Sequence, residues 1–158
     1  MKKATGRAAL SRKMVQFKEK LRGAGIKITP QRLLIFRKLV QTEEHPDAET
    51  LYHQVRQSLQ SISLDTVYRT LATFEKLGLA SKIFFLSTRA RYDPNMEHHH
   101  HFVCTSCGYV GDISLSENRD AFSNEVREIG TVKSMQIELL GTCKSCIQHH
   151  HASTENQR

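Results

Sequence analysis

Two Cys-x-x-Cys pairs, at Cys104 and Cys107 and at Cys143 and Cys146, constrain this 158-residue chain more than any other feature. They use all four of its cysteines and are separated by 35 residues. Such a pair can fold as a tight knuckle that offers both thiolates to one ion, and two knuckles suit a closed tetrahedral zinc site. Each knuckle follows an apolar run, so we expect a structural zinc ion to join two distant strands. Two disulfides or a redox dithiol are the alternatives.

Four consecutive histidines lie directly before the first knuckle. Because side chains alternate along an extended strand, His99 and His101 should face one way and His98 and His100 the other. One of these pairs can then bind a metal distinct from the zinc. The alternative is an exposed histidine run without a role.

Composition narrows the class of protein. The length allows one domain or two small ones. The sequence has no run of about 18 apolar residues and no secretory signal, which predicts neither a membrane span nor export. Thiols in metal-type spacing then indicate the reducing cytoplasm.

Charge divides the chain into two parts. Residues 1–94 hold 18 Lys/Arg against 8 Asp/Glu, net +10, whereas residues 95–158 hold 5 against 8, net −3. A strongly basic half is the footprint expected of a protein that binds a polyanion such as double-stranded DNA.

The basic half reads as short helices followed by a hairpin. After a polar arm over residues 1–10, a helix begins at Ser11, and Thr29, Asp47 and Ser63 should cap three more. Short strands at 83–86 and 90–92 form the hairpin. This order predicts a winged-helix domain over residues 1–93, followed by a hinge at 94–97.

The helix from Leu64 to Leu77 is the candidate recognition helix, because the later helix of such a fold enters the major groove. Its outer face should carry side chains that can reach bases or phosphates: Asp65, Thr66, Tyr68, Arg69 and Thr70. The alternative is an ordinary amphipathic helix with a polar outer face.

The second half predicts a small α/β domain over residues 98–147 and a disordered tail at 148–158, so the overall class is α+β. A hairpin should frame the first knuckle. A helix capped by Ser116 should bury Val126 and Ile129, and residues 131–140 should form a strand.

Histidines and carboxylates supply a second candidate metal site: His45, Asp93, His99, His101 and Asp112. Mixed nitrogen and oxygen donors suit iron(II) or manganese(II). An ion that draws ligands from both domains would stabilise one arrangement of them. Alternatively, His45 is a satisfied turn residue and Asp93 caps the hinge.

These motifs together resemble the ferric uptake regulator (Fur) family of dimeric, metal-dependent repressors. The resemblance runs from about Leu21 to Cys146 and rests on five stretches: Lys27-Ile-Thr-Pro-Gln-Arg32, His45-Pro46, Thr66-Val-Tyr-Arg69, the histidine run into Cys104-x-x-Cys107, and Cys143-x-x-Cys146. It implies a homodimer, formed through the second domain, that binds a palindromic operator. It also implies that Tyr68 and Arg69 enter the groove and that Lys27 lies near the minor groove.

The resemblance also implies roles for the metal ligands. Structural zinc takes the four cysteines, and the regulatory iron(II) or manganese(II) takes His45, Asp93, His99, His101 and Asp112. The two aspartates resemble the peroxide-responsive branch (PerR), in which His45 and His99 are the expected sites of oxidation. A third site on His98 and His100 would find Arg119 and Met135 where many iron sensors have ligands.

Three functions follow in order of preference. The first is a metal-dependent transcriptional repressor that senses peroxide, with iron sensing as the alternative. The second is a metalloenzyme using the histidine and aspartate site, and the third is an RNA-binding zinc module. We expect no catalysis, because no spare general base lies beside the ligands and five ligands leave little open coordination.

Overall fold

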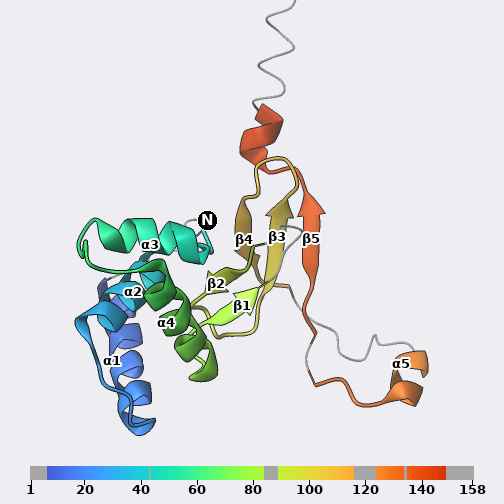
Figure 1. Cartoon of the computed structure of the whole chain (residues 1–158). Coiled ribbons are helices and arrows are strands. Elements are labelled where there is room, and N and C mark those ends of the chain that lie inside the picture. Colours follow the sequence, from blue (N-terminus) through green and yellow to red (C-terminus); the bar gives the residue numbers. More distant parts are fainter. Residues whose placement is uncertain (1–6, 43, 84–88, 116–123, 134, 149–158) are drawn as a thin grey trace, which may run out of the picture. The chain divides into compact units, whose positions relative to one another are not determined.

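The computed structural model describes residues 7–42, 44–83, 89–115, 124–133 and 135–148. The chain forms two compact units, residues 1–97 and 98–158, of which the first is mainly helical and the second contains a small sheet (Figure 1). The fold is therefore α+β, as predicted. In the described part of the chain, no helix has the length and apolar character needed to span a membrane.

Three helices of the first unit begin at the predicted caps. The side chains of Thr29, Asp47 and Ser63 accept hydrogen bonds from the backbone N–H three residues later. Each bond satisfies a helix-terminal donor that would otherwise lack a partner. The helices are α2 (Pro30–Gln41), α3 (Ala48–Arg56) and α4 (Leu64–Lys76).

Helix α1 (Arg7–Gly23) begins earlier than the sequence predicted. We expected a polar arm up to residue 10, but Leu10 packs against the core of this unit. Helix formation from Arg7 is favoured because it brings this leucine onto the same apolar face as Met14. Gly25, with φ +68°, ends the helix, and the N–H of Ile26 donates to the Leu21 carbonyl.

Three buried phenylalanines join helices α1, α2 and α4. The ring of Phe17 stacks on that of Phe36 with centroids 4.6 Å apart. Phe74 meets both rings edge-on, at 5.6 Å from Phe17 and 5.5 Å from Phe36. Edge-to-face and offset-stacked arrangements add to the free energy gained from burying the rings.

A two-stranded antiparallel sheet completes the winged helix. Strand β1 (Ser81–Ile83) pairs with β2 (Arg91–Asp93) so that Lys82 lies opposite Tyr92. The predicted hairpin is present, although its first strand begins two residues earlier than expected. The rest of that predicted strand, residues 84–86, lies outside the described residues.

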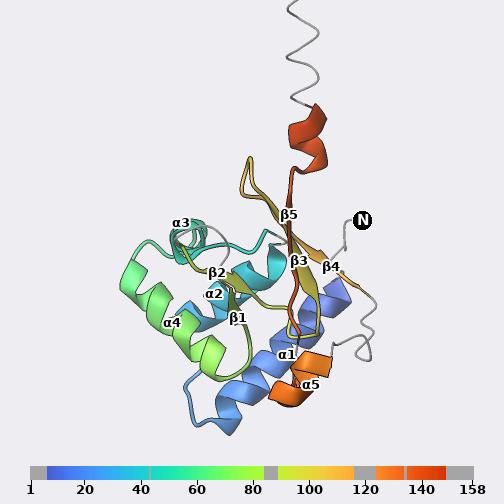
Figure 2. The same cartoon turned by 90° about the vertical axis from the view of Figure 1, so that its right-hand side faces the viewer.

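The second unit is built on a three-stranded mixed sheet of order β4-β3-β5. The central strand β3 (His100–Cys104) pairs antiparallel with β4 (Val110–Ile113) and parallel with β5 (Glu138–Gly141). Figure 2 shows this sheet turned by 90°. The predicted hairpin around the first knuckle is confirmed. The parallel partner brings the end of the chain beside that hairpin.

Two expectations for this unit were wrong. A strand was predicted over residues 131–140, but β5 begins only at Glu138. Its pairing with β3 covers residues 138–141. Ile129, expected to face inward on helix α5 (Asn124–Ile129), is 88% exposed. The small sheet of one chain does not cover this residue. Residues 116–123 and the tail at 149–158 lie outside the described residues.

The phenylalanine cluster predicts a large difference between two positions of α1. Phe17→Ala should lower the free energy of unfolding by about 3–5 kcal/mol, because it removes a buried ring and leaves a cavity. Val15→Ala on the same helix should change it by no more than about 0.5 kcal/mol, because Val15 is 52% exposed. Urea unfolding followed by circular dichroism measures both. Equal effects would contradict the assigned core.

Candidate metal centres and nucleic-acid interface

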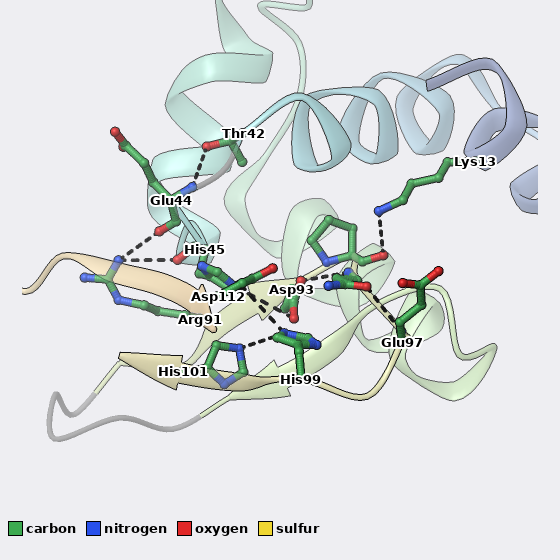
Figure 3. A network of polar contacts seen from close by, with 12 residues as sticks. Lys13, Thr42, Glu44, His45, Arg91, Asp93, Glu97, His99, His101 and Asp112 are labelled. Atoms are coloured by element: carbon green, nitrogen blue, oxygen red, sulfur yellow. Dashed lines mark hydrogen bonds and ion pairs between the residues drawn. The ribbon is translucent and has the colours of Figure 1, made fainter. Parts of the chain in front are cut away.

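Strand β3 and its neighbour β4 bring two histidines and one aspartate together in the second unit. The Nε2 atoms of His99 and His101 lie 3.0 Å apart, as alternation along a strand predicts. Asp112 is the cross-strand partner of His101, and its Oδ1 lies 3.7 Å from Nε2 of His99 (Figure 3). This set offers two imidazoles and one carboxylate to a divalent cation.

The first unit brings together the other two predicted ligands, His45 and Asp93. Both are buried, and Nε2 of His45 lies 3.8 Å from Oδ2 of Asp93. Oδ1 of Asp93 accepts a hydrogen bond of 2.7 Å from the Asn95 N–H, which fixes the direction of the carboxylate. An imidazole beside an oriented carboxylate is a second small nitrogen and oxygen donor set.

The sequence predicts Asn95 only as part of a hinge, but its backbone N–H also orients the carboxylate of Asp93. The signal was available, because Asp and Asn side chains commonly accept a hydrogen bond from the backbone two residues on. An aspartate followed by proline therefore predicts such a turn.

The other two histidines of the run, His98 and His100, were expected to share one side, and their rings meet edge to face with centroids 5.1 Å apart. Nδ1 of His100 accepts a 3.1 Å hydrogen bond from the Ile137 N–H. This bond gives His100 a structural role beside the start of β5. Met135 is partly buried, and Arg119 lies outside the described residues.

The four cysteines come together at one end of the sheet. Because β3 and β5 run parallel with Cys104 opposite Gly141, both knuckles follow strand ends that lie side by side. The first turn uses Gly108 at φ +73°, and the Gly108 N–H donates to the Cys104 carbonyl. The predicted joining of two distant strands is thus present in the backbone.

Sulfur positions distinguish a metal site from disulfides. The Sγ atoms of Cys104 and Cys146 lie 3.9 Å apart, and those of Cys107 and Cys143 lie 3.7 Å apart. Tetrahedral zinc with sulfur at about 2.3 Å requires a sulfur separation of about 3.8 Å. A disulfide would need about 2.05 Å. All four thiols are free, so this cluster fits zinc.

Electrostatics of the thiols point the same way. The backbone N–H of Cys143 donates to the Cys104 sulfur at 3.3 Å. This bond, together with bonds from the N–H groups of Cys107 and Ser106, lowers the pKa of Cys104 to about 6. The neighbouring Cys107 thiol raises the pKa of Cys146 to about 12. Clustered thiolates repel one another, so full ionisation near neutral pH needs a cation among them.

Helix α4 presents a candidate surface for nucleic acid. Tyr68 is exposed, and the Arg69 side chain is 82% exposed. Nη1 of Arg69 lies 3.7 Å from the Asp65 carboxylate one turn earlier. Exposed ion pairs of this kind contribute little stability, so a phosphate or base can replace the aspartate at small cost.

The other predicted contacts differ among themselves. Lys27 is exposed. Thr66 is half-buried, and its hydroxyl lies 2.8 Å from that of Ser63 at the helix cap. Thr70 was expected on the outer face, but it is only 5% exposed. It shares the inward face with Val67 and Phe74 through three- and four-residue spacing, so it does not reach solvent.

Comparison with known proteins places these features in a family. Residues 23–140 match the family described as the ferric uptake regulator family. A peroxide-responsive repressor, PerR, from Staphylococcus aureus strain Mu50 is 31% identical over 132 residues, which cover 80% of this chain and 86% of that protein.

Solved structures agree with the fold. The ferric uptake regulator of Helicobacter pylori, described as having three functional metal-binding sites, superimposes with a TM-score of 0.73 at 26% identity over 87% of this chain and 93% of that one. A zinc-bound manganese uptake regulator gives 0.66 at 32% identity, covering 81% and 98%. The relatives thus include sensors of more than one signal.

The thiol cluster predicts how zinc content responds to substitution. Cys143→Ser should reduce bound zinc well below one ion per chain and destabilise residues 98–148, because structural zinc contributes directly to folding. Ser145→Ala, between the same two cysteines, should keep zinc. Metal analysis and the thiolate-to-cobalt absorption of the cobalt(II) form measure this. A fully zinc-loaded serine variant would remove Cys143 from the site.

Proposed function

This chain belongs to the ferric uptake regulator family, and from that premise we propose that it is a transcriptional repressor whose binding to double-stranded DNA requires a divalent ion. The observation that carries the proposal is the pairing of His99, directly before β3, and His101, on β3, with Asp112 on β4. The four cysteines form a separate zinc site, so the histidines and the aspartate are available to bind a second, exchangeable ion.

The regulatory ion takes all five nitrogen and oxygen donors: His45 and Asp93 from the first unit, and His99, His101 and Asp112 from the second. Three imidazoles and two carboxylates suit iron(II) or manganese(II). An ion bound by ligands of both units stabilises one orientation of the winged helix relative to the sheet. Metal loading then controls DNA binding. Structural zinc occupies Cys104, Cys107, Cys143 and Cys146.

The DNA surface consists of α4 and nearby cations. Tyr68 and Arg69 enter the major groove, and Lys27 reaches the minor groove. Thr66, at the start of the helix, contacts the phosphate backbone of the DNA. Thr70 is left out because it is buried. The net charge of +10 over residues 1–94 supports this surface.

The active form is a homodimer on a palindromic operator. Large apolar side chains remain exposed in the second unit and support a partner that covers them: Tyr109, Ile129, Leu139, Leu140 and Ile147. A two-fold dimer presents two copies of α4 to two half-sites of matching symmetry. Regulation of transcription places the protein in the cytoplasm. Its role is regulatory rather than enzymatic, because family relatives are repressors.

Peroxide is the proposed signal, and iron sensing is the alternative. The two aspartates at 93 and 112 resemble the peroxide-responsive branch, and a PerR protein is 31% identical to this chain. Bound iron(II) would supply the electron that cleaves the peroxide O–O bond and would recover one electron when the imidazole is oxidised. In the net change, a ring C–H of His45 or His99 would take up one peroxide oxygen atom, and the other oxygen atom would leave as water. The altered ligand binds the ion less tightly.

Arg69→Ala should weaken operator binding about tenfold or more, because a base or phosphate contact is lost. Lys76→Ala removes the same charge from the far end of α4 and should have little effect. The duplex is selected from a random library with manganese-loaded protein, and affinity is measured at fixed salt. Unchanged affinity in Arg69→Ala, or binding that does not need manganese(II), would contradict the proposal.

Peroxide sensing predicts a mass change in a defined place. One equivalent of hydrogen peroxide should add about 16 Da to peptides containing His45 or His99 in the iron(II) form and release the DNA, because the oxidant forms beside these ligands. The manganese(II) form serves as the control and should stay unmodified and bound. The cysteines should be spared, since zinc is redox-inert. Unmodified histidines with retained DNA binding would instead assign iron sensing.

A further inference from the structure

Arg91 connects the two ligands of the first unit without being a ligand itself. It lies on β2, two residues before Asp93, and its side chain turns back to the loop that carries His45. Its Nη1 donates to the carbonyl oxygens of Glu44 and His45, each at 3.3 Å (Figure 3). One guanidinium therefore holds two successive peptide groups of that loop.

The His45 loop needs such support because its backbone is in an uncommon conformation. His45 has φ +46°, the one described non-glycine residue in the left-handed region. Residues other than glycine are disfavoured in this region, and they adopt it only where the surrounding structure stabilises the conformation. The backbone helps as well, since the Tyr92 N–H donates to the Pro46 carbonyl at 3.0 Å. Strand β2 thus holds the loop by its backbone and by Arg91.

We propose that Arg91 is a positioning residue for the regulatory metal: it holds the His45 imidazole beside the Asp93 carboxylate before any ion binds. The inference rests on the proposed function, because it assigns His45 and Asp93 to that ion. Preorganised ligands lose less freedom on binding, so the side chain raises metal affinity although it carries a positive charge.

The charge of Arg91 and its positioning contacts have opposite effects on metal affinity, and this difference provides a test. Removing a cation beside a metal site should by itself strengthen binding of a divalent ion, whereas removing a positioning contact should weaken it. Arg89 offers the matched control. It lies two residues earlier, and its Nη1 pairs with Glu49 at 2.5 Å and with Asp47 at 3.8 Å. These described contacts are with side-chain carboxylates at the start of α3, whereas those of Arg91 are with backbone carbonyls of the His45 loop.

The positive charges of Arg89 and Arg91 both lower the pKa of the Asp47 carboxyl, so the two side chains place charge in the same neighbourhood. Burial raises the pKa of Asp47, but hydrogen bonds from Thr50 and the charges of Arg89 and Arg91 outweigh burial and lower it. Replacing either arginine by methionine removes one positive charge from the same neighbourhood. The Arg91 replacement also removes the donor that the carbonyls of Glu44 and His45 accept from.

The experiment measures manganese(II) binding to zinc-loaded full-length protein, with free manganese quantified by electron paramagnetic resonance. We expect Arg91→Met to weaken binding about tenfold or more, the usual effect of losing a group that orients a ligand. Arg91→Lys should lie between that variant and the unchanged chain, since an ammonium keeps a donor. Arg89→Met should bind as tightly as the unchanged chain or more tightly.

Zinc content and circular dichroism establish that each variant is folded. If Arg91→Met is unstable, the manganese(II) affinity of Arg91→Lys is compared with that of the unchanged chain instead. Unchanged or tighter manganese binding in the Arg91 variants would overturn the inference while leaving the proposed function intact. If the unchanged chain binds no manganese(II), or binds it equally after His45→Ala, the proposed regulatory site fails instead.

Discussion

The hydrogen bonds that hold β3 between β4 and β5 are the interaction on which the second unit depends. This strand carries His101 near its start and Cys104 at its end, so two metal sites of different chemistry share one backbone. The antiparallel neighbour supplies Asp112, and the parallel neighbour leads to the second knuckle. A one-residue slip in register would exchange the faces of every histidine and separate the donors.

The two units are stabilised in different ways. The main apolar core of the described residues runs from Phe17 to Tyr92, entirely within the first unit. In the second unit, Val103 and Val110 are the large aliphatic side chains described as buried. Among the described residues this is little apolar burial for a small sheet, so a zinc ion on the cysteine cluster would contribute directly to the stability of this unit.

Local chemistry was predictable from the sequence, and tertiary burial was less so. Thr29, Asp47 and Ser63 cap helices as expected because a cap needs only the next three residues. Strand alternation predicted the paired histidines, and the two Cys-x-x-Cys spacings predicted the joined knuckles. Thr70 and Ile129 were misplaced because their burial depends on which helix face meets a neighbour. The contacts of Arg91 span 46 residues or more and have no local pattern.

The parallel pairing of β3 with β5 also sets an order of assembly during synthesis. The first unit is complete at residue 97 and depends on helices with short connections, so it can fold while the rest of the chain is still being made. The thiol cluster must wait for Cys146 to leave the ribosome, because the second knuckle follows β5. Until then Cys104 and Cys107 form an open two-thiol site. The nascent chain is therefore most exposed to thiol oxidation and to the wrong metal between the emergence of Cys107 and that of Cys146.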